Sequence, residues 1–220
     1  MKYLRILQHI TFVIFCYLLI LITLQYIPIN TNTAFLMLKV EEVKIFYYPF
    51  AFFTHVFSSI FCLILGYFLF IDKIRKKHIR IHQNLGKIYI IIVLLMAGPS
   101  GLIISLHANG GIYARVSFMI LSLCWLVFTG LGYISIKNKN FDNHEKWMIR
   151  SYALTLSAIS LRFFKWLIVL ILELPPLTTY QIVAWIGWVF NILLAEFIIY
   201  NKFKKNILNK KILVSLHSKI

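Results

Sequence analysis

The sequence predicts an all-α integral membrane bundle of six transmembrane helices with both termini in the cytoplasm. Of its 220 residues, 60% are hydrophobic and only 14% are charged, and the mean hydropathy is +0.82. This composition is too apolar for a water-soluble domain. At roughly 20 apolar residues for each helical crossing, the chain has room for about six crossings with short loops.

Six apolar runs carry this interpretation. Each is close to the length that an α-helix needs to cross about 30 Å of hydrocarbon, whereas the strands of a β-barrel would give alternating segments of about ten residues. The runs are Ile10–Ile27, Phe46–Ile71, Ile88–Leu106, Ile112–Ile134, Met148–Leu172 and Ile182–Tyr200. The first run follows basic residues as a signal peptide does, but residues 25–33 offer no small-residue cleavage site, so we expect a retained helix.

The distribution of Lys and Arg among the connections predicts the orientation. Most of them lie before the first run, between the second and third, between the fourth and fifth, and after the sixth. Because positively charged loops stay in the cytoplasm, both termini are expected there, in the cell membrane. The net charge of +16 is then a topology signal, and no nucleic-acid partner is implied.

The same runs divide the chain into three parts. Residues 1–45 form a first helix and its external loop, residues 46–200 a five-helix core, and residues 201–220 a basic cytoplasmic tail. The tail alternates Lys with apolar residues, which favours a solvated topology anchor; an interfacial helix on anionic lipid is the alternative.

Two basic residues inside the fifth run are the strongest functional signal. Arg162 lies 14 residues beyond Met148, about 21 Å along the helix, and Lys165 follows on the same face. A charge at the bilayer centre costs about 2.5–3.5 kcal/mol on insertion scales, so such residues normally face the bundle interior and mark function. The alternative is that both side chains reach the external interface and bind lipid phosphates.

Further polar residues within the runs extend this signal. The intramembrane polar set also contains His55, Asn191 and Glu196. One hypothesis is therefore a transporter or binding protein for a small anion or a lipid headgroup, with a cavity lined by Arg162, Lys165, Ser122, Thr129 and Asn191. Glu196 is expected at a different depth from Arg162, near the basic cytoplasmic residues Arg80, Lys87 and Arg150. In the third run, the sequence Ala97–Gly101 should kink the helix and leave room for a cavity.

Two histidines suggest a second hypothesis, a haem b electron-transfer protein that exchanges electrons with quinone or a membrane redox partner. His82 and His144 precede the third and fifth runs on the same side of the membrane, and two imidazoles at equal depth are what a b-type haem requires. Arg150 and Lys87 would be available for its propionates. The alternative is that both are ordinary interfacial histidines.

The sequence contains no phosphate-binding loop, nucleophile elbow or zinc-protease motif, and its three cysteines lie in apolar runs without metal-ligand spacing. Soluble-enzyme chemistry therefore has no support. A purely structural membrane subunit and an enzyme acting on lipid remain as further alternatives.

Several segments resemble a family of multi-pass membrane proteins, domain of unknown function 2306. The resemblance rests on residues 55–66, on the string HQNLGKIY at 82–89, on HEKWMIRSYALT at 144–155 and on residues 184–196. It implies a membrane location and no particular activity. The residues that coincide with the family pattern are His55, His82, His144, Arg150, Arg162, Asn191 and Glu196.

Overall fold

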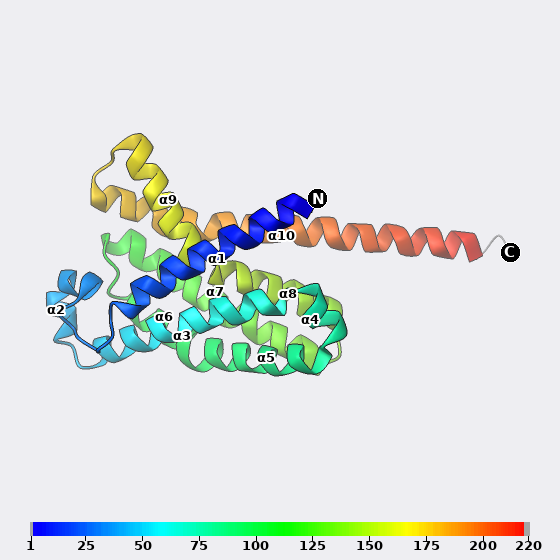
Figure 1. The fold of residues 1–220 in the computed structure, drawn as a ribbon, viewed down its shortest axis with the longest axis horizontal. Coiled ribbons are helices and arrows are strands. Elements are labelled where there is room, and N and C mark those ends of the chain that lie inside the picture. The colour runs from blue at the N-terminus through cyan, green and yellow to red at the C-terminus, as the bar shows by residue number, and fades with distance from the viewer. Residues whose placement is uncertain (1, 218–220) are drawn as a thin grey trace.

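The computed structural model describes the backbone of residues 2–217 and the side chains of residues 6–7 and 9–204. Within these residues the chain is all-α, 86% helical and without strands. Figure 1 shows the helices arranged along one long direction, with both ends of the chain toward the same end of the molecule. The elements are α1 (Lys2–Leu24), the short helix η1 (Ala34–Leu38), α2 (Val40–Val43), α3 (Tyr47–Leu69), α4 (Asp72–Lys77), α5 (Ile79–Ile92), the π-helix η2 (Val93–Ala97), α6 (Gly98–Ser105), α7 (Gly111–Lys137), α8 (Phe141–Thr155), α9 (Ser157–Leu172) and α10 (Pro176–His217).

Four helical segments are long and apolar enough to cross a membrane. They are α3, the continuous stretch Ile79–Ser105, α7, and residues Pro176–Lys204 of α10. Helices α8 and α9 together would make a fifth span, bent by 42°. The apolar part of α1, His9–Leu24, is shorter. The predicted helical membrane bundle is confirmed, while six crossings and cytoplasmic termini stay predictions.

The helices extend beyond the apolar runs that predicted them. The third run begins at Ile88, whereas its helix begins at Ile79, and the fifth run begins at Met148, whereas its helix begins at Phe141. Hydropathy marks the hydrocarbon region, but a helix keeps its backbone hydrogen bonds into the headgroup region. The predicted tail likewise continues α10 as far as His217, and its last three residues lie outside the described part.

Buried hydroxyl groups join the central helices. The Tyr89 hydroxyl lies 3.0 Å from Ser151 Oγ and 2.8 Å from Thr155 Oγ1, and Thr129 Oγ1 lies 2.7 Å from Ser151 Oγ. All four residues are buried. Small hydroxyl residues permit close approach of helices in membranes and satisfy one another across the interface, so this network fixes α5, α7 and α8 together.

The bend between α8 and α9 has a local cause. Thr155 Oγ1 donates to the Ser151 carbonyl at 3.2 Å and Ser157 Oγ to the Ala153 carbonyl at 3.5 Å, a type of back-bonding that bends helices. Asn191 on α10 spans the bend. Its Nδ2 donates to the Ala153 carbonyl at 3.0 Å, and its Oδ1 accepts from Ser160 Oγ at 2.8 Å.

The third span contains the irregularity expected from the sequence Ala97–Gly101. The turn before Gly98 is the π-helix η2, where the Gly98 N–H bonds to the Val93 carbonyl. Pro99 follows and has no N–H to donate. Such π-helical turns widen a helix and occur frequently at functional sites.

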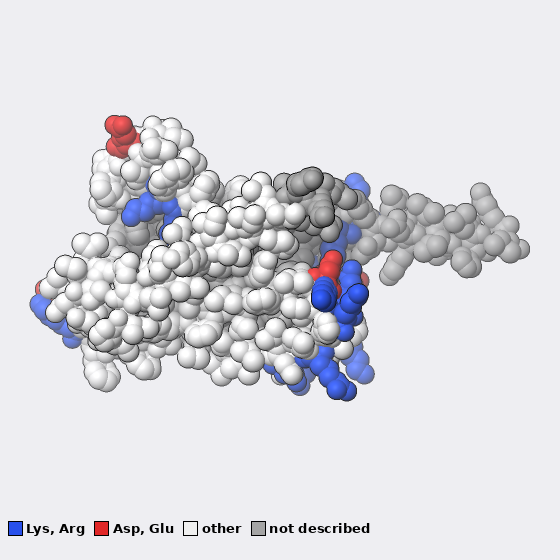
Figure 2. Space-filling model, in the orientation of Figure 1, with Lys and Arg blue, Asp and Glu red and all other residues white. Residues whose placement is uncertain are grey.

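Charged side chains concentrate at one end of the molecule. Figure 2 shows Lys and Arg gathered around α4 and the beginning of α5, which we call the α4 end; the opposite end, where α2 lies, is the α2 end. A separate group of basic atoms lies in the hollow beside α9, away from both ends. The only Lys and Arg residues of α9 are Arg162 and Lys165.

Candidate functional site

The larger of two cavities lies toward the α2 end, between α1, α3, α6, α7 and α9. Its volume is about 460 Å³, within the usual range for small-molecule sites. We call it the Arg162 cavity. Besides an extensive apolar wall, its lining includes the polar side chains of Thr23, Tyr26, Lys39, Tyr48, His55, Ser59, Ser105, His107, Ser122, Thr155, Ser157, Arg162, Lys165 and Tyr180.

Arg162 and Lys165 enter this cavity from one face of α9. The Arg162 guanidinium donates from Nη1 to the Ala158 carbonyl at 2.7 Å, one turn earlier on the same helix. Among the described side chains, neither residue takes part in an ion pair. None of the seven Asp and Glu residues of the chain lines the cavity. The cavity therefore presents an excess of positive charge.

The third cation of the cavity, Lys39, is neutralised. Its side chain is only 2% exposed, and Nζ lies 2.9 Å from Glu42 Oε1 and also donates to the His107 carbonyl. Burial alone would raise the pKa of the Glu42 carboxyl, but the hydrogen bond and charge of Lys39 hold that pKa below its ordinary value. Lys39 thus ties the connection after α1 to the connection after α6.

His55 lies in the wall of the same cavity with a defined tautomer. Its Nδ1 is 2.9 Å from the Ala97 carbonyl, which can only accept, so Nδ1 carries the proton and Nε2 is the acceptor of the neutral ring. A Cβ on Gly101 would lie 2.9 Å from Cε1 of this ring and 3.4 Å from Ser122 Oγ. The glycine of α6 therefore makes room for the imidazole beside the Ser122 hydroxyl.

The structure separates the polar residues that the sequence grouped around Arg162. Lys165, Ser122 and His55 line the Arg162 cavity with it. Thr129 does not, because its hydroxyl is buried against the Trp125 carbonyl and Ser151. The Asn191 amide is hydrogen-bonded to Ala153 and Ser160 at the α8–α9 bend. It lines a second, smaller cavity, which is described below.

Neither of the two proposed haem ligands lines either of these cavities. His144 Nδ1 donates to the Gly132 carbonyl at 2.8 Å, and His82 Nδ1 is buried without a hydrogen-bond partner. In the described part of the chain, no group of three or more His, Cys, Asp and Glu side chains is placed to hold a metal ion. Haem binding through this pair stays a prediction.

The basic residues assigned to haem propionates are placed differently from one another. Arg150 forms a two-pronged ion pair with Glu196, with Nε 2.5 Å from Oε1 and Nη2 2.8 Å from Oε2. Its guanidinium also lies 4.6 Å from the centre of the Trp147 ring. The expectation that Glu196 meets the basic residues of the α4 end is confirmed. Lys87 is exposed on α5.

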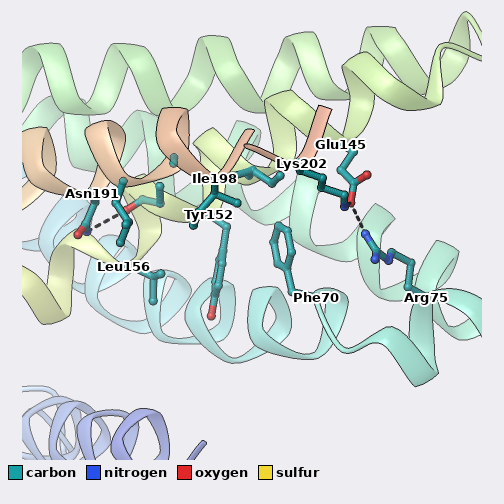
Figure 3. Close-up of a pocket in the computed structure, with 12 residues that line it drawn as sticks. Phe70, Arg75, Glu145, Tyr152, Leu156, Asn191, Ile198 and Lys202 are labelled. Atoms are coloured by element: carbon teal, nitrogen blue, oxygen red, sulfur yellow. Dashed lines mark hydrogen bonds and ion pairs between the residues drawn. The ribbon is translucent and has the colours of Figure 1, made fainter. Parts of the chain in front are cut away.

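The smaller cavity, of about 280 Å³, lies between the end of α3, α8 and α10 near the α4 end. We call it the Glu145 pocket. Figure 3 shows Glu145 and Arg75 joined at one end of the pocket, and Lys202 also contacts this carboxylate, with Nζ 2.5 Å from Oε1. Sequence reasoning missed Glu145, Lys39 and Tyr152. For Lys39, the spacing of Lys39 and Glu42 at i, i+3 was a sequence signal that could have predicted their ion pair.

The sequence matches the family described as predicted membrane protein (DUF2306) over residues 52–199. This range contains His55, the α8–α9 bend, Arg162, Lys165 and most of both cavities, but excludes α1 and Lys39. No curated protein and no solved structure matches the chain. Because the match covers well over half of the 220 residues, the chain belongs to this family of membrane proteins.

Proposed function

We propose that the protein binds the anionic headgroup of an amphiphilic molecule, a phosphate or a carboxylate, in the Arg162 cavity. The observation that carries this proposal is the Arg162 guanidinium, which is exposed in a largely apolar hollow beside α9 and has no carboxylate partner among the described side chains. A cation at this depth of the bilayer raises the free energy of the folded protein unless an anion pairs with it. A bound anion would supply the missing partner.

The geometry of the basic group suits an oxyanion. A guanidinium presents a planar fork of N–H donors that matches phosphate and carboxylate oxygens, while an ammonium contributes a compact charge. Lys165 lies one turn from Arg162, and the Ser122 hydroxyl shares the cavity, whereas the Thr155 and Ser157 hydroxyls already donate to backbone carbonyls. Lys165 and Ser122 can satisfy the oxygens that a single guanidinium leaves unpaired.

The surroundings favour an amphiphile over a free inorganic anion. The cavity wall includes apolar residues of α1 and α9, such as Leu19, Ile22 and Leu161. On the lipid-exposed part of α9, Phe163, Trp166 and Leu170 are exposed hydrophobic residues. An apolar tail can therefore lie against α9 while the headgroup contacts Arg162.

Binding of single-chain lipids to the detergent-purified protein tests the proposal. The probes are oleate, oleoyl lysophosphatidate and the neutral monoolein, which share one acyl chain. At least one acid should bind more tightly than monoolein, and Arg162→Met should weaken that binding about 10- to 100-fold, the value of a charged hydrogen bond. The matched control is Arg115→Met, an exposed arginine on α7 that does not line the cavity. Equal binding to Arg162→Met and the parent protein would leave a purely structural role for Arg162.

The membrane topology is part of the same proposal. We place α1, α3, the Ile79–Ser105 segment, α7, the α8–α9 pair and α10 as six crossings, with the α4 end and both termini in the cytoplasm. The concentration of Lys and Arg at the α4 end supports this orientation. Tags at each terminus should resist external protease in intact cells, and digestion of one tag would contradict six crossings.

The haem hypothesis is the less favoured one, because Arg150 is already engaged with Glu196. A reduced-minus-oxidised absorption spectrum of the purified protein tests it directly. Sharp haem bands that disappear in His82→Ala and His144→Ala would establish it and displace the lipid-binding proposal.

A further inference from the structure

The Arg162 cavity and the Glu145 pocket approach each other at the α8–α9 bend. Within the segment 152–158, Tyr152, Ala153 and Leu156 line the Glu145 pocket, whereas the residues that line the Arg162 cavity are Leu154, Thr155, Ser157 and Ala158. One short stretch of bent helix therefore forms a wall of both cavities. The Glu145 pocket lies nearer the α4 end, and the Arg162 cavity lies nearer the α2 end.

The wall between them consists of few side chains. Tyr152 donates its hydroxyl to the Leu63 carbonyl on α3 at 3.1 Å, and Leu156 packs against the cluster that contains Leu63. Leu63 itself lines the Arg162 cavity. Tyr152 and Leu156, which line the Glu145 pocket, thus adjoin Leu63 and its cluster on the side of the Arg162 cavity.

The Tyr152 ring lies in a slot that a glycine makes possible. A Cβ on Gly66 would lie 2.1 Å from Tyr152 Cε2, so the ring rests directly on the α3 backbone. On its other side the ring stacks on Phe70, with centroids 5.2 Å apart, and Figure 3 shows the two rings side by side. The hydrogen bond to Leu63 is the polar contact that anchors this ring across the wall.

Both sides of the wall present cations to an anion. Arg162 and Lys165 lie on one side, and on the other Arg75 and Lys202 share the single carboxylate of Glu145. An anion that reaches the Glu145 pocket can compete with this carboxylate for two cations. Broken membrane helices with polar groups at the break are characteristic of transport sites.

We propose that Tyr152, Leu156 and Leu63 form a gate, and that the protein moves its anionic ligand between the Arg162 cavity and the Glu145 pocket. The bend at Leu156, spanned by Asn191, supplies the hinge on which Tyr152 leaves its slot. This inference rests on the proposed anion binding, but the gate itself can be tested without any ligand.

Labelling of Leu156→Cys by a membrane-impermeant methanethiosulfonate tests the gate. The reagent is added to one face of the membrane at a time, in spheroplasts and in inverted vesicles, and the parent protein gives the background of Cys16, Cys62 and Cys124. With Tyr152 present, the thiol should react only from the face onto which the Glu145 pocket opens. With Tyr152→Ala added, it should react from both faces, at least tenfold faster from the far face.

Matched variants separate the gate from general loosening. Tyr133→Ala removes an exposed tyrosine of α7 and should leave the labelling one-sided. Tyr152→Phe keeps the ring and removes only the hydrogen bond to Leu63, so it should raise the far-face rate by a smaller factor, about two- to fivefold. An unchanged far-face rate in both Tyr152 variants, or two-sided labelling with Tyr152 intact, would overturn the gate.

Efflux of oleoyl lysophosphatidate from proteoliposomes into external albumin tests the passage of the proposed anionic ligand. Tyr152→Ala should release it faster than the parent and Tyr133→Ala, and Arg162→Met in the same chain should remove this excess. Failure of the lipid-binding assay, together with labelling that becomes two-sided only in Tyr152→Ala, would refute the proposed ligand and keep the gate. Two-sided labelling without any excess efflux would refute anion passage alone.

Discussion

The α4 end and the Arg162 cavity use the same residue types in opposite ways. At the α4 end, Arg150 is paired with Glu196, and Arg75 and Lys202 share Glu145. In the Arg162 cavity, Arg162 and Lys165 have no carboxylate partner among the described side chains. This contrast between paired and unpaired cations is the basis on which we propose a ligand for Arg162.

Lys39 makes the comparison sharper because it lines the Arg162 cavity and yet is paired with a carboxylate, as the cations of the α4 end are. It is almost fully buried and is held by Glu42 and the His107 carbonyl. A cation that lines the cavity is therefore not always free to pair with a ligand. The presence or absence of a carboxylate partner decides it.

The largest effect is expected from breaking the Lys39 pair. Glu42→Gln leaves a buried ammonium without its counter-charge and should lower the free energy of unfolding by about 3 kcal/mol. Glu41→Gln is the matched control, because its partner Lys44 is exposed and the loss should be below about 0.5 kcal/mol. Thermal unfolding in detergent measures both, and equal losses would contradict the buried role of Lys39.

A second effect concerns the close packing on the α4 side of the gate. Gly66→Ala places a methyl group inside the Tyr152 ring position and should cost about 2 kcal/mol of unfolding free energy. Gly130→Ala, where no atom lies within 4 Å of the added carbon, should be neutral or slightly stabilising. A similar midpoint for the two variants would show that Tyr152 does not occupy this slot.

The paired arginine at the α4 end should respond less strongly. Glu196→Gln removes the partner of Arg150, whose side chain is 18% exposed, while Glu196 itself is 46% exposed. Partial solvent access places the expected loss between an exposed and a buried pair, at about 1–2 kcal/mol. Chemical unfolding in mild detergent measures it. A second substitution, Arg150→Met, should recover part of the loss.

Acid should weaken the Lys39 pair selectively. Because Lys39 holds the pKa of Glu42 below its ordinary value, the pair stabilises the fold above the unfolded-state pKa of about 4.3 and loses this contribution as the pH falls through the lower folded-state pKa. The difference in unfolding midpoint between the parent and Glu42→Gln should therefore shrink as the pH falls below about 4. A constant difference down to pH 3 would contradict the assignment.

The smallest effect on stability is expected for Arg162→Met, the substitution with the largest expected effect on anion binding. Arg162→Met breaks no ion pair and loses only an exposed hydrogen bond to the Ala158 carbonyl, so the free energy of unfolding should change by no more than about 0.5 kcal/mol. The same variant should lose anion binding. A loss above about 1 kcal/mol would mean that Arg162 is structural, like Arg150.

Particular residues show how far sequence reasoning reaches. Arg162, Lys165 and His55, which the sequence singled out, line one cavity, and Glu196 meets Arg150 as expected, because hydropathy and helical rise give the depth of each residue in the bilayer. Their role as site residues stays a prediction. Thr129 and Asn191, which one hypothesis placed beside Arg162, do not line the Arg162 cavity. Depth does not say which face of a helix meets which neighbour, since a small rotation of α7 or α10 changes every contact without changing the hydropathy pattern.

The sequence by itself determined that this is a helical membrane protein with basic residues at one set of loops and two cations deep in the fifth run. Those properties depend on transfer free energies that add along the chain, residue by residue. Only the tertiary structure decided that Lys39 is neutralised, that Arg162 enters a cavity, and that Tyr152 closes against Leu63. These outcomes depend on the bend at Leu156 and on the packing of rings against Gly66 and Gly101, which arise between helices distant in sequence.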